Sequence, residues 1–145
     1  MKVEFRKATI DDVEGIIKLC NECFNENSSI EYAIENFNKT KDDPNQIYLI
    51  GVVDGIIIAH TKITVIPTMY EAMNTFSILN HVCVRPDLRR HNIGTQMLDE
   101  ITKISKENNC KTMKLWSKNF RQAAHACYQH YGFTIDEAKF FEKEI

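Results

Sequence analysis

The spacing of hydrophobic residues predicts a strand and two helices at the start of the chain. Val3 to Arg6 alternates apolar and polar positions, as a half-buried strand does. Thr9 followed by Asp12 is a weak capping signal for a helix. The apolar face of that helix consists of Val13, Ile16, Ile17, Cys20 and Phe24. A second, shorter helix is predicted over 30–37, after a polar loop.

Two runs rich in β-branched residues follow, over 46–53 and 56–66. They are joined by Asp54 and Gly55, a dipeptide that favours a two-residue β-hairpin turn. Strict alternation in the second run places Ile57, Ala59, Thr61, Ile63 and Val65 on the more apolar side, and His60, Lys62 and Thr64 on the other. We therefore expect an antiparallel pair at this point.

A central strand is predicted over 75–84, because apolar residues occupy both of its faces. Strict alternation places His81 on the same face as Ser77, Leu79 and Cys83, opposite Phe76, Ile78, Asn80, Val82 and Val84. A helix over 94–107 and a strand over 111–117 follow, which together make a βαβ-like unit. A helix over 121–131 and one or two strands over 133–144 complete the chain.

These elements predict an α/β fold with a mixed, largely antiparallel sheet and about four helices. With 145 residues, of which 43% are apolar, one domain over 1–145 can bury a sufficient core without metals or disulfides. A net charge of -2 gives no general attraction to nucleic acid or to an anionic membrane. The first residues contain no apolar run of the length that a signal peptide or a spanning helix needs, so we expect a cytoplasmic protein.

The five cysteines are odd in number and scattered, which does not suggest a disulfide framework. Cys20 and Cys23 have the spacing of a metal or redox pair, but they fall late in a helical pattern. No second pair or nearby histidine accompanies them, and a zinc site needs four ligands. We therefore interpret them as core residues and expect no metal.

The segment from Val82 to Thr95 has the order of an anion-binding site. A buried strand is halted by Pro86, and a basic loop then leads to a helix that opens near Gly94. The first turn of a helix has backbone N–H groups without partners, and the helix dipole places partial positive charge there. Arg89 and Arg90 approach that helix end, so the loop is suited to a pyrophosphate.

Two motifs in this half of the chain resemble the GNAT superfamily of N-acetyltransferases. Arg89-x-x-Asn92-x-Gly94 resembles the acetyl-CoA pyrophosphate loop of that family, whose pattern is Gln/Arg-x-x-Gly-x-Gly/Ala. Asn92 departs from it by replacing the first glycine, although Asn tolerates left-handed backbone angles. The segment from Arg121 to Phe133 resembles the family's last helix, in which a tyrosine is followed by Gly-Phe.

The resemblance implies a GNAT-like acyl-CoA N-acyltransferase fold whose two central strands splay apart to receive the acetyl-pantetheine arm. It implies acetyl transfer from acetyl-CoA, the co-substrate, to a primary amine of a small molecule or protein by direct attack on the thioester. Dimerisation is common in that family. The residues expected at CoA are Val82, Cys83, Val84, Arg89, Arg90, His91, Asn92, Ile93, Gly94, Thr95 and Asn119. For Asn119, a helix cap or a turn residue is an equally good interpretation.

Tyr128 corresponds to the tyrosine that often protonates the leaving thiolate in that family. A phenol suits this role because its basicity is close to that of a thiolate. The alternative is a core tyrosine on the helix stripe, and Tyr131 lies one turn later.

The general base is less clearly indicated. His81 lies on the central strand, and histidine is the residue type that titrates near neutral pH. Its predicted face, shared with Leu79 and Cys83, also suits a buried structural histidine. His60 and Glu71 are further options, Asn80 could only orient a water or the amine, and the amine could arrive already deprotonated.

A CoA-binding module without transferase activity, serving as a sensor or an assembly subunit, is the main alternative function. The chain lacks the Gly-Lys-Ser/Thr sequence of a phosphate-binding NTPase. Its basic residues are few and gather at the predicted CoA loop, which argues against nucleic-acid binding. The acceptor would contact residues 25–37, residues 67–74 and the C-terminal strands, which carry no recognisable specificity motif.

Overall fold

The computed structural model describes all residues from 1 to 145 and contains one five-stranded sheet. The strands are β1 (Glu4–Lys7), β2 (Gln46–Val53), β3 (Ile56–Ile66), β4 (Phe76–Val84) and β5 (Thr112–Lys114). They lie in sequence order, and every neighbouring pair is antiparallel except β4 and β5, which are parallel. The predicted mixed, largely antiparallel sheet is therefore confirmed.

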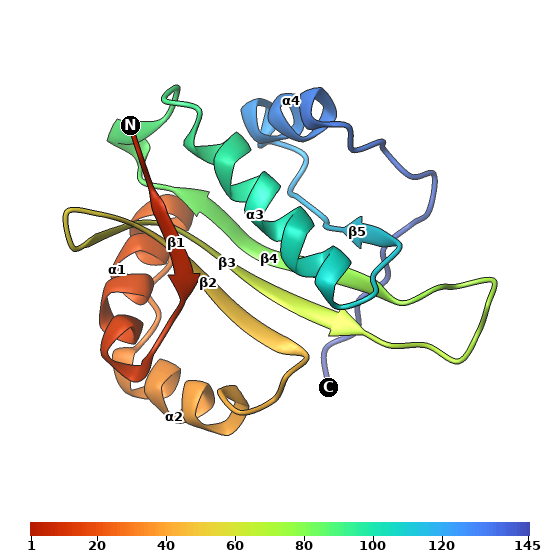
Figure 1. Cartoon of the computed structure of the whole chain (residues 1–145), viewed down its shortest axis with the longest axis horizontal. Helices are drawn as coiled ribbons and strands as arrows, with labels where there is room; N and C mark the ends of the chain where they lie inside the picture. Colours follow the sequence, from red (N-terminus) through yellow and green to blue (C-terminus); the bar gives the residue numbers. More distant parts are fainter.

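Four helices cover the two faces of this sheet (Figure 1). They are α1 (Val13–Phe24), α2 (Ile30–Thr40), α3 (Ile93–Glu107) and α4 (Gln122–Tyr131), with 3-10 turns at Ile10–Asp12 and Pro86–Leu88. α1 and α2 lie on one face, and α3 and α4 on the other. None of these helices combines the length and the apolar character that crossing a membrane requires.

The core has two parts, one on each side of the sheet. The larger part joins the sheet to α3 and contains Leu49, Ile63, Leu79, Met97, Leu98 and Ile101, among others. The smaller part joins the sheet to α1 and contains Ile16, Leu19, Cys20, Ile50 and Cys83. Burial of these apolar side chains on both faces holds the central strands rigidly between the helices.

The local signals at the turn and at the first helix are confirmed. Asp54 and Gly55 adopt φ values of 50° and 77°, as the hairpin turn between β2 and β3 requires. The backbone N–H of Thr9 donates to the Asp12 carboxylate at 2.8 Å, which closes the capping box. That box begins the 3-10 turn from which α1 continues.

The predicted alternation along β4 is wrong at His81, because a β-bulge interrupts the strand. Lys62 pairs with Asn80 and His60 pairs with Cys83, so two residues of β4 lie opposite Thr61 alone. His81 has a φ of 52°. The bulge reverses the faces: Leu79 packs toward α3, whereas Cys83 packs toward α1. The side chain of His81 is 47% exposed and is not a core histidine.

Two predictions near the C-terminus are also wrong. The strand expected over 111–117 ends at Lys114, because β5 pairs with β4 only at Phe76–Ile78 and has no partner beyond. Residues 133–144 form no strand. They run down from α4 past β5 (Figure 1), and Phe140 stacks on Trp116 with ring centroids 5.3 Å apart. An aromatic contact, rather than a backbone ladder, thus fastens this segment.

Candidate active site

An opening between β4 and β5 is the central feature of the candidate site. Beyond Ile78, β4 has β3 on one edge and no strand on the other. The backbone N–H of Arg85 donates to the Ile58 carbonyl of β3 at 2.8 Å. Because alternate residues direct their backbone groups to opposite edges, those of Val82 and Val84 face the opening. The expected splaying of the central strands is thus present, and it leaves backbone groups available to a ligand.

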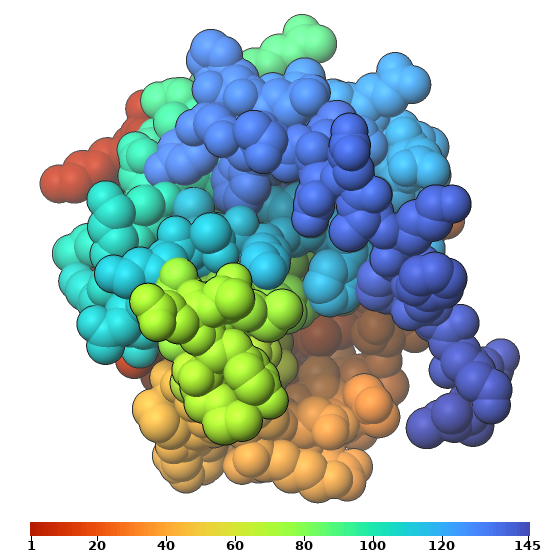
Figure 2. Space-filling view, turned by 90° about the vertical axis from the view of Figure 1, so that its right-hand side faces the viewer, coloured from red at the N-terminus to blue at the C-terminus, as the bar shows by residue number.

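The face of the molecule that carries the loop 67–75 is hollowed (Figure 2). Figure 2 shows a recess between the loop 67–75, α2 and the C-terminal residues, with α1 visible at its base. These are the segments that were expected to border the acceptor, although the C-terminal part contributes no strands. The loop and the chain near the C-terminus carry exposed apolar side chains, namely Met69, Tyr70, Met73, Trp116 and Phe140.

The loop between β4 and α3 leaves its positive charge free. The Arg85 guanidinium donates to the Asp87 carboxylate at 2.7 and 3.1 Å, which folds the first turn of the loop. The exposed Arg89 and Arg90 form no ion pair with a carboxylate. The two basic side chains that the sequence assigned to the phosphates are therefore unneutralised, and His91 lies exposed beside them.

The N-terminus of α3 is open to an anion. Asn92 is the N-cap residue and has a φ of 62°, in the left-handed region that the glycine of the family pattern also suits. Its side chain does not cap the helix. The N–H groups of Ile93, Gly94 and Thr95 belong to the first turn and have no acceptor within the helix. The buried Ile93 side chain anchors this turn to the core.

Tyr128 and Tyr131, one helical turn apart on α4, have different surroundings. Burial raises the pKa of Tyr128 to about 12, and the nearby thiols of Cys127 and Cys83 add to the shift. The hydroxyl of Tyr131 instead donates to the Asp99 carboxylate at 2.7 Å and lies 3.1 Å from the Thr102 hydroxyl, both on α3. Tyr131 is thus held by structural hydrogen bonds, whereas Tyr128 lies near β4 and the opening.

The helix that carries these tyrosines ends at the Gly-Phe pair. Gly132 is its C-cap with a φ of 122°, a backbone conformation that favours glycine. The Phe133 ring packs edge-on against the Tyr128 ring, with centroids 5.8 Å apart. The pair therefore ends α4 and supports the Tyr128 ring in place.

His81 forms a contact with a carboxylate that the sequence did not indicate. Its Nε2 atom lies 3.1 Å from each carboxylate oxygen of Glu26, just after α1. The Phe24 ring meets the imidazole of His81 edge-on, with ring centroids 5.0 Å apart. The Arg121 guanidinium lies over the Phe24 ring, 4.6 Å from its centroid. A row of side chains thus connects α1, the β4 bulge and the start of α4. No local pattern could have found Glu26, because it is 55 positions from His81.

The other candidates for a base or an orienting group lie in less suitable places. His60 is 4% exposed, and its Nδ1 lies 2.9 Å from the Leu49 carbonyl. Burial lowers the pKa of His60 to about 4, so it is a poor base. Glu71 is exposed in the loop 67–75, and Asn80 is half-buried before the bulge. Asn119 lies exposed in the turn before α4, whose N-cap is Arg121.

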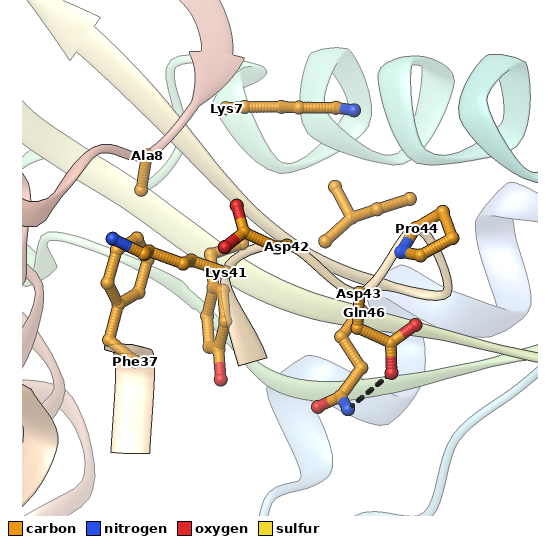
Figure 3. Close-up of a pocket in the computed structure, with 10 residues that line it drawn as sticks. Lys7, Ala8, Phe37, Lys41, Asp42, Asp43, Pro44 and Gln46 are labelled. Carbon is orange, nitrogen blue, oxygen red and sulfur yellow. Dashed lines mark hydrogen bonds between the residues drawn. The ribbon is translucent and has the colours of Figure 1, made fainter. Parts of the chain in front are cut away.

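A separate cavity of about 230 Å³ lies between the end of β1, the end of α2 and the start of β2. Figure 3 shows its lining, which includes Lys7, Phe37, Lys41 and Asp42. None of the predicted site residues lines it. No group of three or more His, Cys, Asp or Glu side chains is placed to hold a metal ion. The opening between β4 and β5 therefore stands as the candidate active site.

Comparisons with known proteins identify the family and the fold of the chain. Residues 13–133 match the sequence model of the acetyltransferase (GNAT) family. No curated protein matches the sequence. Among solved structures, a transcriptional regulator from Bacillus halodurans C-125 has a TM-score of 0.89 at 18% identity, covering 99% of this chain and 100% of that one.

Two acetyltransferase structures are also similar. Glucosamine-6-phosphate N-acetyltransferase from Arabidopsis thaliana has a TM-score of 0.83 at 15% identity, and the match covers 99% of each chain. The aminoglycoside N-acetyltransferase AAC(6')-Iy in complex with CoA has a TM-score of 0.85 at 13% identity, covering 99% of this chain and 95% of that one. At these identities, the likeness concerns the fold.

Proposed function

Because the chain belongs to the acetyltransferase (GNAT) family, we propose that it transfers an acetyl group from acetyl-CoA to a primary amine. The acceptor is a small molecule or a protein side chain, and its amine attacks the thioester directly. One observation carries this proposal: β4 has an unpaired edge beyond Ile78, carries His81 in contact with Glu26, and leads through a basic loop to a helix N-terminus without a side-chain cap. The solved structures of acetyltransferases with the same fold support it.

Acetyl-CoA binds along β4 and the loop that follows. The pantetheine arm pairs with the backbone groups of Val82 and Val84 that face the opening, as a short added strand would. The pyrophosphate meets the N–H groups of residues 93–95, with Arg89 and Arg90 beside it, because a helix N-terminus attracts anions. His91 and Asn119 border the ligand. This placement brings the thioester toward His81 and Tyr128.

The proton steps follow from the side chains at the opening. The amine nitrogen attacks the acetyl carbon, and His81 takes the proton that the nitrogen loses. Glu26 orients the imidazole and stabilises the positive charge that the imidazole gains. When the carbon–sulfur bond breaks, Tyr128 donates its proton to the CoA thiolate. With a pKa of about 12, Tyr128 remains protonated at neutral pH and is available as this acid.

A CoA-binding module that transfers no acetyl group is the second candidate. A similar structure is described as a transcriptional regulator, and it matches this chain over nearly its whole length. The same loop and the same edge of β4 would serve such a module, but the His81–Glu26 pair and Tyr128 would have no proton to move. The two candidates therefore differ in turnover and not in CoA binding.

The test is calorimetric titration with acetyl-CoA, followed by thiol release with an amine panel. The panel contains an amino-sugar phosphate, an aminoglycoside, a polyamine and a lysine-containing peptide. Binding with turnover is expected. Binding without turnover on any amine would favour the CoA-binding module, and absence of binding would contradict both candidates.

A charge-reversal pair tests the loop itself. Arg89→Glu with Arg90→Glu should weaken acetyl-CoA binding by about 100-fold or more, because two phosphate contacts become repulsive. The matched control is Lys103→Glu with Lys106→Glu, the same charge change at exposed positions toward the other end of α3. Equal effects of the two pairs would show a general charge effect and remove the case for the loop.

A further inference from the structure

One arginine of the chain has neither a carboxylate partner nor a place in the proposed CoA site. Of the five arginines in the sequence, two pair with carboxylates and two lie in the loop assigned to the pyrophosphate. The fifth is Arg121, the N-cap residue of α4, which is half-buried and forms no ion pair. A partly buried guanidinium without a counter-ion can gain strong, charge-assisted hydrogen bonds from an anionic ligand.

Two aromatic rings hold the Arg121 guanidinium. Its central carbon lies 4.6 Å from the centroid of the Phe24 ring and 5.3 Å from that of the Phe120 ring. A guanidinium over an aromatic ring is attracted by the π electrons, and its N–H groups, which radiate in its own plane, remain able to bind other partners. The rings therefore place Arg121 without consuming its hydrogen-bond donors.

The same Phe24 ring connects Arg121 to the proposed base. The imidazole of His81 meets this ring with centroids 5.0 Å apart, and Glu26, two residues after Phe24, contacts the imidazole Nε2. Tyr128 follows Arg121 by seven positions, or about two helical turns, so both belong to one face of α4. Arg121 thus lies at the candidate active site, one ring away from His81.

The segment that carries Arg121 is positive throughout. Residues 108–135, which follow α3 and include β5 and α4, contain three lysines and Arg121 but no Asp or Glu. By contrast, the Glu26 carboxylate supplies negative charge beside His81. The site therefore has a positive part at Arg121 and a negative part at Glu26. This distribution favours a molecule that carries both an anionic group and an amine.

We propose that the acceptor is a small zwitterion, a primary amine that also carries a carboxylate or a phosphate, and that Arg121 binds its anionic group. This inference rests on the proposed function and names the class of acceptor. The anionic oxygens accept hydrogen bonds from the guanidinium, while the amine lies at His81 beside Glu26. Because Arg121 and His81 both contact the Phe24 ring, the molecule is compact, of the size of an amino acid or an amino-sugar phosphate.

Two other roles of Arg121 make different predictions. If Arg121 bound CoA, its removal would weaken acetyl-CoA binding. If it only joined α1 to α4 through Phe24, its removal would slow the reaction of every acceptor to the same extent. Only a contact with the acceptor's anionic group makes the loss depend on whether the acceptor has that group.

The experiment compares amines that differ in the anionic group. The pairs are β-alanine with β-alaninamide, 3-aminopropyl phosphate with 3-aminopropanol, and glucosamine 6-phosphate with glucosamine. In at least one pair, the anionic member should have a kcat/KM about tenfold or more above that of its neutral partner. Calorimetric titration of the CoA-saturated protein should show the same preference in Kd. The pairs that show it distinguish a carboxylate from a phosphate.

Variants of Arg121 then assign the preference to this side chain. Arg121→Ala should lower kcat/KM for the preferred anionic acceptor by about 30-fold or more, because a charge-assisted contact is lost. The neutral partner and the Kd of acetyl-CoA should be unchanged. Arg121→Lys should retain part of the preference. The matched control is Lys118→Ala, which removes an exposed positive charge three residues earlier and should keep the wild-type preference.

Several outcomes would overturn the proposal. They are equal kcat/KM and Kd within every pair, equal losses for anionic and neutral acceptors in Arg121→Ala, weaker acetyl-CoA binding in that variant, or the same effect of Lys118→Ala. Absence of thiol release with every amine would instead contradict the proposed transfer. In that case, the Kd values of the paired amines would still decide whether Arg121 binds an anionic group.

Discussion

The imidazole of His81 and the carboxylate of Glu26 form a contact that two left-handed backbone positions make possible. Nε2 of His81 lies 3.1 Å from both oxygens of Glu26. His81, in the β4 bulge, has a φ of 52°, and Asn25, which ends α1, has a φ of 51°. The bulge turns His81 out of the sheet core, and the helix cap places Glu26 in front of it. The pair is therefore built by the fold, not by a local motif.

Replacing either member of this pair should lower turnover but not CoA binding. His81→Ala should reduce kcat by about 100-fold or more, the usual contribution of a positioned base. Glu26→Gln keeps the size of the side chain but loses its charge, so a smaller reduction of about tenfold is expected. Steady-state kinetics and acetyl-CoA titration measure the two effects.

The control for this prediction is Glu35→Gln, which removes an exposed carboxylate that pairs only with Lys39 on α2. It should leave kcat unchanged. A wild-type kcat in His81→Ala would show that the amine arrives deprotonated or that another group accepts its proton.

Tyr128 and Tyr131 provide a matched comparison on one helix. Tyr128→Phe should lower kcat about tenfold or more, with acetyl-CoA affinity unchanged, because only the proton donor is lost. Tyr131→Phe should leave kcat unchanged but lower the free energy of unfolding by about 1 kcal/mol, since it loses hydrogen bonds to Asp99 and Thr102. Urea unfolding and steady-state kinetics separate these outcomes, and a reversal of the two effects would make Tyr131 the acid.

The pH profile adds a second test of Tyr128. Because burial raises its pKa to about 12, Tyr128 stays protonated throughout the usual assay range. Its titration should therefore cause no alkaline fall in kcat near pH 10, where an ordinary tyrosine titrates. A fall that appears near the ordinary tyrosine range and disappears in Tyr128→Phe would contradict the burial of this hydroxyl.

The arrangement of elements could be predicted because it depends on local patterns. The limits of β2 and β3 follow from their β-branched runs and from the Asp54-Gly55 turn. The start of α3 follows from the basic loop and the left-handed Asn92. Hydrophobic periodicity and turn residues act over a few positions, so the sequence carries them directly.

The parts that could not be predicted depend on long-range geometry. No residue of β4 indicates a bulge, and strict alternation along the predicted strand places His81 on the same face as the core residues Leu79 and Cys83. Lys111 to Ser117 reads as a strand, but its length is set by where β4 diverges, which is a property of the whole sheet. Glu26 and Phe24 reach His81, and Arg121 reaches Phe24, only after three elements have packed together. The surroundings of His81, the proposed base, could therefore not be predicted from the sequence.

His60 should make the stability of the protein depend on pH. Burial lowers its pKa to about 4 in the folded state, below the ordinary histidine value of 6.5. The unfolded chain therefore binds the proton more readily, and stability is full above pH 6.5 and is lost as pH falls toward 4. The loss should approach about 3 kcal/mol.

Urea unfolding at pH 7 and pH 5 measures this effect. His60→Gln should flatten the dependence because the side chain no longer titrates. His130→Gln, an exposed change near the end of α4, should retain the wild-type slope. If His60→Gln keeps that slope too, other groups account for the loss of stability in acid.

Asn92 should tolerate glycine but not a β-branched residue. Its φ of 62° lies in the left-handed region, where a branched Cβ collides with the backbone. Asn92→Gly should therefore keep both stability and acetyl-CoA affinity, whereas Asn92→Val should cost about 1–2 kcal/mol of stability. Asn92→Val should also weaken acetyl-CoA binding, because relief of the strain would turn the N–H groups of α3 away from the phosphates. Thermal unfolding and calorimetry measure both, and equal affinity of the two variants would show that the loop geometry at Asn92 does not position the ligand.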